Sequence, residues 1–122
     1  MTLKQSERSS YLLREAKKIA REVRENFQRA EYERVIRKTH EALELWLKGR
    51  ILESGVEPAK IHDLMQLDQR LPKPSGLSNE DLLFLTTERI PAFYGAEDII
   101  PDKAYAVEDG ERCLRCLDKV GL

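Results

Sequence analysis

The apolar residues between Tyr32 and Gly55 recur at intervals of three and four, which is the repeat of an α-helix. They form two adjoining rows, one made of Val35, Thr39, Ala42 and Trp46 and the other of Ile36, Leu43, Leu47 and Ile51. Two rows occupy much of a helix circumference, so this segment should be buried on several sides. We expect it to be the central rod of a helical bundle.

The segment before it, from about Gln5 to Phe27, has a single apolar stripe. Its members step by three and four and are Leu12, Ala16, Ile19, Ala20, Val23 and Phe27. This pattern predicts one amphipathic helix with a charged outer face. The link from Asn26 to Glu31 is short, so the central helix should run antiparallel to the first.

Glycine and proline divide the remainder of the chain into shorter elements. Gly55 should end the central helix in a left-handed conformation, and Pro58 is suited to the first turn of the next helix. That third helix is predicted from the spacing of Ile61, Leu64, Met65, Leu67 and Leu71. A loop rich in proline and glycine, residues 71–76, follows.

Ser78 and Asp81 resemble a weak capping box at the start of a fourth helix. Its apolar face is predicted to contain Leu82, Leu83, Leu85 and Ile90. Pro91 disfavours the α conformation of the residue before it, so the helix should end near Arg89. The loop through Tyr94, Gly95 and residues 99–101 is expected to place its aromatic side chains over one end of the bundle.

The last predicted helix starts at Asp102 and reaches about Lys119. One of its faces contains Ala106, Gly110, Cys113, Leu117 and Val120. A glycine inside a helix costs about 1 kcal/mol relative to alanine, so a close approach of another helix at Gly110 is a plausible compensation. No alternating pattern predicts a sheet. The 122 residues are therefore predicted to form one all-α domain, 1–122, an up-and-down antiparallel bundle of four to five helices.

The net charge of -1 hides an uneven distribution. Counted along the chain, residues 1–60 carry 14 basic and 10 acidic side chains, and the remainder carry 7 and 12. The positive half could attract a nucleic acid or an acidic partner, but a sequence pI of about 6.2 is far from that of a typical nucleic-acid binder. We therefore favour the simpler interpretation, that these charged side chains solvate the outer faces of the helices. No signal peptide or membrane span is visible, so a cytoplasmic protein is expected.

Cys113 and Cys116 form a CxxC pair, which can bind zinc or exchange thiols. A structural zinc site needs four ligands, and the only histidines, His40 and His62, are on different predicted elements. The spacing of the two cysteines suits packing within a helix. We predict no metal site and no cofactor.

A polar strip of Arg37, His40, Glu44 and Lys48 follows the central helix at steps of three and four. The strip is either a seam of internal ion pairs between helices, which we favour, or a groove for a ligand with a phosphate group. His62 and Asp63 are a further acid–base candidate, but adjacent helical residues point about 100° apart. His62 is more simply expected to anchor the start of the third helix.

Three short motifs together resemble those of the HEPN domain (higher eukaryotes and prokaryotes nucleotide-binding). Residues 42–49 read Ala-Leu-Glu-Leu-Trp-Leu-Lys-Gly and resemble the helix that ends in ExxLKA, with Glu44 and Lys48 at the matching positions. His62-Asp63-Leu64 matches HDL, and Arg89-Ile90-Pro91 resembles RYP. The resemblance extends over nearly the whole chain.

This resemblance implies a four- or five-helix bundle that is commonly a homodimer. Small members of the family are often encoded beside a minimal nucleotidyltransferase, with which they form toxin–antitoxin pairs. Nucleotide binding was proposed for the family, and many members are metal-independent RNases that use an R-x4-6-H motif in the later part of the domain.

The present sequence departs from that motif, because no histidine follows His62. The only literal match is Arg34 to His40, whose six helical steps rotate the side chains about 240° apart. We assign no catalytic residue. The first hypothesis is a non-catalytic binding module for a nucleotide, an RNA or a nucleotidyltransferase partner; the alternatives are an RNase that uses His40 with Arg34 or Arg37, and a self-associating scaffold.

Overall fold

The structure is a computed structural model that describes residues 3–95 and 100–122. The described residues form six helices and no strand, which confirms the predicted all-α bundle. The helices are α1 (Leu3–Gln28), α2 (Tyr32–Glu53), α3 (Leu64–Gln69), α4 (Asn79–Tyr94), α5 (Pro101–Ala104) and α6 (Val107–Lys119). Within the described ranges, no helix combines the length and the apolar character needed to cross a membrane.

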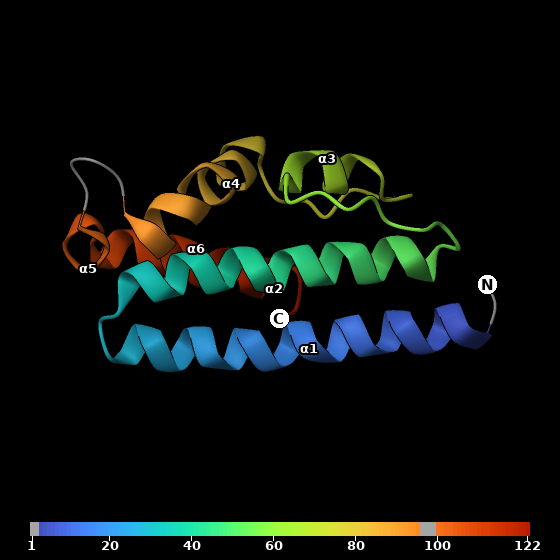
Figure 1. Cartoon of the computed structure of the whole chain (residues 1–122), viewed down its shortest axis with the longest axis horizontal. Helices are drawn as coiled ribbons and strands as arrows, with labels where there is room; N and C mark the ends of the chain where they lie inside the picture. Colours follow the sequence, from blue (N-terminus) through green and yellow to red (C-terminus); the bar gives the residue numbers. More distant parts are fainter. Residues whose placement is uncertain (1–2, 96–99) are drawn as a thin grey trace.

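The predicted central rod is α2, which contacts all five other helices. It runs antiparallel to α1, and α3 and α4 lie on the side of α2 opposite α1 (Figure 1). The backbone N–H of Glu31 donates to the carbonyl of Asn26 across the short link between α1 and α2. Both apolar rows are buried apart from Trp46, which is half-buried. The central position of α2 was thus correctly predicted from its two rows.

The segment after α2 differs from the prediction at Pro58. Gly55 has a φ of +92° and ends the helix as expected, but residues 56–63 are not helical. The third helix begins only at Leu64, because the Asp63 side chain caps it by accepting hydrogen bonds from the N–H groups of Met65 and Gln66. Pro58 therefore does not open a helix.

Helix α4 begins where predicted and ends later. The Ser78 hydroxyl accepts a hydrogen bond from the Asp81 N–H, as a capping residue does. The helix then continues through Pro91 to Tyr94 and closes with a bond from the Gly95 N–H to the Pro91 carbonyl. Proline disfavours the interior of a helix, but α4 includes Ile90 and Pro91, so the predicted end near Arg89 was wrong.

The apolar side chains of α4 do not all lie on one buried face. Leu82 and Leu85 are buried, whereas Leu83 and Ile90, which were predicted on the same face, are 56% and 48% exposed. Tyr94 is 74% exposed, so it does not cover the end of the bundle as expected. Ile99 lies outside the described residues.

The predicted last helix is divided into α5 and α6. Asp102 lies inside α5 and does not cap the long helix. The break occurs because Tyr105 is extended and the Ala106 N–H is bonded to the Asp109 side chain, which starts a new helix at Val107. Ala106 is accordingly exposed, whereas the end of the helix at Lys119 is as predicted.

The close helix approach expected at Gly110 is confirmed. A β-carbon at this position would lie 2.8 Å from Cδ2 of Phe27 and 3.0 Å from Cδ1 of Tyr32. These two rings pack edge to face with centroids 5.8 Å apart. Gly110 therefore lets α6 lie directly against the aromatic pair at the α1–α2 turn.

Candidate functional site

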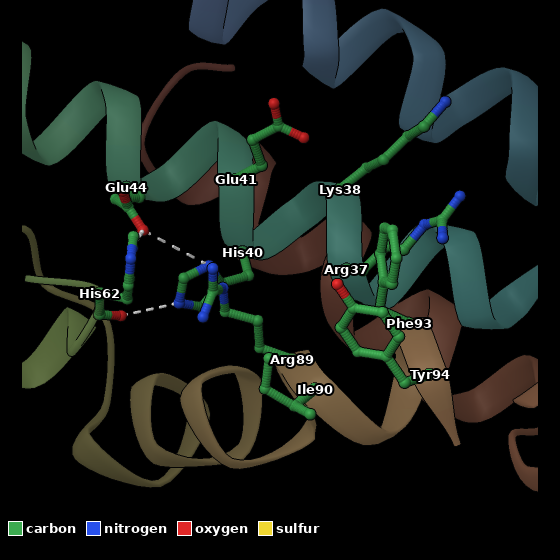
Figure 2. A pocket seen from close by; sticks show the side chains of 10 residues that line it. All are labelled: Arg37, Lys38, His40, Glu41, Glu44, His62, Arg89, Ile90, Phe93 and Tyr94. Atoms are coloured by element: carbon green, nitrogen blue, oxygen red, sulfur yellow. Dashed lines mark hydrogen bonds and ion pairs between the residues drawn. The ribbon is translucent and has the colours of Figure 1, made fainter.

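The polar strip of α2 faces a pocket of about 420 Å³. The pocket is enclosed by α2, by residue 62 before α3 and by the last turns of α4; its lining residues are Arg37, Lys38, His40, Glu41, Glu44, His62, Arg89, Ile90, Phe93 and Tyr94. Glu44 and His62 lie at one end, His40 and Arg89 in the middle, and Arg37 with the two aromatic residues at the other end (Figure 2). We call this space the α2–α4 pocket.

His40 joins α2 to the segment that precedes α3. Its ring is only 1% exposed, and Nε2 lies 2.8 Å from the carbonyl oxygen of His62. Because a carbonyl only accepts, Nε2 carries the hydrogen and donates it. Burial lowers the pKa of His40 and outweighs the opposing effect of that hydrogen bond and of Glu44. The imidazole is therefore held neutral and serves as a structural link.

Glu44 is the centre of a paired cluster at one end of the pocket. Its Oε1 is 2.8 Å from His62 Nδ1, and its Oε2 accepts a hydrogen bond of 3.0 Å from Lys48. Burial alone would raise the pKa of Glu44, but the hydrogen bonds from His62 and Lys48 lower it below its ordinary value. This part of the strip is thus internally paired, but the pairs lie within α2 and with the segment before α3 and not between helices, as the favoured prediction had it.

The other end of the pocket has positive charge without a paired carboxylate. The Arg37 guanidinium lies 4.5 Å from the centre of the Phe93 ring, and Arg89 extends from α4 toward His40 (Figure 2). Within residues 3–95 and 100–122, neither arginine has a carboxylate oxygen within 4 Å. Two guanidinium groups from different helices are therefore available to a ligand.

The structure brings together Arg37, His40 and Glu44 of the predicted strip, whereas Lys48 lies beyond the pocket wall and reaches it only through Glu44. Arg34 also lies outside the wall; it is exposed and 3.8 Å from Glu33.

Among the motif positions, His62 and Arg89 line the pocket, Asp63 caps α3, and Pro91 lies within α4. His62 and Asp63 do not pair with each other, as expected; His62 anchors this region through its ring and its carbonyl.

Sequence reasoning missed Lys38, Glu41, Ile90, Phe93 and Tyr94 as pocket residues. Phe93 follows Arg89 by four residues, which is the helical spacing for one face. That spacing was not recognised, because the helix was expected to end near Arg89. Because α4 continues through Pro91, its last turn brings Phe93 and Tyr94 to the pocket.

The two cysteines lie elsewhere, in the hydrophobic core. Both are unpaired thiols, and burial raises the pKa of Cys113 and of Cys116 to about 12. This environment fits the packing role that we favoured. In the described part of the chain, no three His, Cys, Asp or Glu side chains gather closely enough to hold a metal ion.

Comparison with known proteins gives one match. The family model of the HEPN domain matches residues 9–121, nearly the whole chain. No curated protein and no solved structure matches the sequence or the fold significantly.

Proposed function

This chain belongs to the HEPN domain family, and from that premise we propose that the α2–α4 pocket binds the phosphate group of a nucleotide or an RNA without cleaving it. The observation that carries the proposal is the pair of arginines, Arg37 and Arg89, that reach the same pocket and form no ion pair with a carboxylate of residues 3–95 and 100–122. Guanidinium groups form bidentate, charge-assisted hydrogen bonds with phosphate oxygens.

The aromatic residues support a nucleotide in particular. Phe93 and Tyr94 line the pocket beside Arg37 and are half or more exposed. Bases stack on exposed aromatic rings, which contributes about 1–3 kcal/mol per base. A volume of about 420 Å³ lies within the range of small-molecule sites. The pocket therefore offers a stacking surface next to its two cations.

The charge of the pocket also favours an anion. Among the described residues its two carboxylates are Glu41, which is exposed, and Glu44, which is already paired with Lys48 and hydrogen-bonded to His62. The arginines retain their charge at all physiological pH values. The electrostatic potential that the described residues create inside the pocket is thus positive.

The environment of His40 supports binding rather than catalysis. Nε2 donates its hydrogen to the carbonyl of His62, and Nδ1 faces Glu44 at 3.8 Å. A ring that is 1% exposed, whose Nε2 hydrogen is already donated to a backbone carbonyl, is poorly placed to exchange a proton with a substrate hydroxyl. His40 together with Arg34 or Arg37, the alternative weighed from the sequence, is therefore a poor acid–base pair.

Isothermal titration of the purified protein with ATP, with AMP and with a single-stranded RNA oligonucleotide tests the proposal. We expect saturable binding of at least one of them that weakens as salt is added, because phosphate contacts release counterions. Binding of none of the three ligands at low salt would refute it.

A second candidate function, metal-independent RNA cleavage, is supported by the environment of His62. Its Nδ1 is held by Glu44 while the side chain is 56% exposed. A histidine oriented by a carboxylate is an arrangement suited to general acid–base catalysis. In this reaction His62 Nε2 would take the proton of a ribose 2′-hydroxyl as its oxygen bonds to the adjacent phosphorus, and Arg89 would stabilise the charge on that phosphate. The bond from phosphorus to the 5′-oxygen breaks, which leaves a 2′,3′-cyclic phosphate and a 5′-hydroxyl protonated by water.

Cleavage of a labelled structured RNA by wild type, and its loss in His62→Ala but not in Lys17→Ala, would establish this second function. Intact RNA after incubation with wild type would eliminate it.

We propose further that the protein is a homodimer and acts with a minimal nucleotidyltransferase, as one component of a toxin–antitoxin pair. Family membership supports this proposal. The exposed apolar side chains of Leu83, Ile90 and Tyr94 on α4 are also typical of an interface. Co-purification with a nucleotidyltransferase encoded beside this protein tests the partner; absence of a complex after co-expression would refute it.

A further inference from the structure

A second pocket, of about 360 Å³, lies at the opposite end of α2 from the turn to α1. Three segments enclose it: the last turns of α2, the loop after α3 and the end of α6. Its lining residues are Trp46, Arg50, Glu53, Ser54, Leu71, Pro72, Lys73, Pro74, Ser75, Lys119 and Val120. We call it the Trp46 pocket. It shares no lining residue with the α2–α4 pocket.

One part of the lining of the Trp46 pocket is apolar. Trp46 is the only tryptophan of the chain and is half-buried. Leu71 and Val120 are partly buried against the core, and the rings of Pro72 and Pro74 complete the wall. A half-buried indole beside aliphatic groups is the kind of surface that becomes an anchor point in protein interfaces.

The rim of the pocket carries unpaired positive charge. Lys73 and Lys119 come from different segments and are both exposed. Neither has a carboxylate within 4 Å among the residues that the structure describes. The one carboxylate of the pocket, Glu53, is 2.9 Å from Arg50 and is thereby neutralised. The rim is therefore positive by about two charges.

The loop that forms one wall is fixed by hydrogen bonds. The buried carboxylate of Asp68 accepts a bond from the Ser75 N–H, and the Ser75 hydroxyl accepts one from the Leu77 N–H. The Lys119 side chain lies close to Gly76, 3.8 Å from where a β-carbon would be. A wall that is ordered before binding lowers the entropy cost of binding.

We infer that the Trp46 pocket binds a short acidic segment of a partner protein, with an apolar side chain against Trp46 and flanking carboxylates on Lys73 and Lys119. A peptide fits better than a nucleobase, because Trp46 is the one aromatic ring among the described residues that line the pocket, and Arg50 already lies over that ring, 5.8 Å from its centre. The two rim cations are separate lysines, suited to two carboxylates of an extended chain. This inference is independent of phosphate binding in the α2–α4 pocket.

Selection from a displayed library of random heptapeptides on the full chain tests the inference, followed by synthesis of the most enriched peptide. We expect a consensus with a large apolar residue flanked by Asp or Glu. Because Trp46 is the only tryptophan, its fluorescence reports occupancy of this pocket directly. The peptide should change the emission of Trp46 in a saturable way, and added salt should weaken its affinity.

The double variant Lys73→Glu with Lys119→Ala should weaken peptide binding about tenfold or more. Two controls accompany it: Arg14→Ala with Lys17→Glu, an equal charge change on α1, and Arg89→Ala in the other pocket. Both should leave the affinity within about twofold. The inference is overturned by a selection without an acidic consensus, by binding that the lysine variant does not weaken, or by a Trp46 response to AMP and not to the peptide.

Discussion

Nδ1 of His62 lies 2.8 Å from Oε1 of Glu44, so a residue outside any helix is tied to the middle of the central helix. The carbonyl of the same residue accepts the hydrogen of His40 Nε2. Two side chains of α2 thus hold His62, which lies in the segment before α3: Glu44 binds its ring and His40 binds its backbone carbonyl. This attachment positions one wall of the α2–α4 pocket.

Replacing His40 by alanine should lower the free energy of unfolding by about 2–4 kcal/mol. The change leaves a cavity at a fully buried position and removes the donor for the His62 carbonyl. Urea unfolding measures the effect, with the exposed Lys17→Ala as the control. A loss below about 0.5 kcal/mol would show that the link is not structural.

The free energy of unfolding should fall as the pH falls below about 6.5. Burial lowers the pKa of His40, so the unfolded chain, with an ordinary value of about 6.5, takes up a proton before the folded chain does. The stability due to neutral His40 is complete above that pH and is lost below it, by at most about 1.4 kcal/mol per pH unit. Glu44, whose pKa is also lowered, adds a loss only below about pH 4.5.

Urea unfolding of wild type and of His40→Gln at a series of pH values between 7.5 and 5 tests this dependence. The variant should show a shallower slope below pH 6.5. Equal slopes, or a wild type that is more stable at pH 5.5 than at pH 7, would contradict the assignment.

Replacing Gly110 by alanine should destabilise the protein by about 1–2 kcal/mol, although alanine is the better helix former. The new methyl group would lie 2.8 Å from the Phe27 ring. Thermal unfolding measures the effect, with Glu111→Ala in the same helix as the control. Restoration of stability on adding Phe27→Leu would identify the ring as the cause; a more stable Gly110→Ala protein would contradict it.

The helices whose apolar residues recur with a strong period were predictable from the sequence. Periodicity located α1 and α2 almost to the residue, because the buried rows of α2 must each face a neighbour. The polar strip was found for the same reason, since Arg37, His40 and Glu44 interrupt the apolar rows on one side. The spacing of apolar and polar residues along α2 was therefore enough to predict Arg37, His40 and Glu44 among the residues that α2 contributes to the pocket.

The α4 half was not predictable, because local rules and tertiary structure disagree there. The conformational bias before Pro91 predicts a helix end, yet α4, which packs against α2, continues through Ile90 and Pro91. The bond between His40 and the carbonyl of His62 joins residues 22 positions apart and depends on the backbone, which side-chain patterns do not encode. The break between α5 and α6 was missed for a different reason. The last helix was expected to start at Asp102, whereas Asp109 caps it by accepting a hydrogen bond from the Ala106 N–H.

The proposed homodimer predicts a mass in solution of about twice the 14.2 kDa of one chain. Leu83→Lys with Ile90→Lys should reduce it to the monomer mass, because charges would enter the apolar interface on α4. Light scattering at several concentrations measures the mass, and Glu111→Lys serves as the control. A wild-type monomer at high concentration would contradict the dimer, and an unaffected variant would move the interface away from α4.

The central claim is that the α2–α4 pocket binds a phosphate group through Arg37 and Arg89. Its most direct test is the dissociation constant of the tightest-binding ligand among ATP, AMP and single-stranded RNA, measured by isothermal titration on wild type, Arg89→Ala and the exposed control Arg115→Ala. The account predicts affinity weakened about tenfold or more in Arg89→Ala, as expected for the loss of a charge-assisted hydrogen bond, and unchanged affinity in Arg115→Ala. Equal affinity of wild type and Arg89→Ala would contradict it.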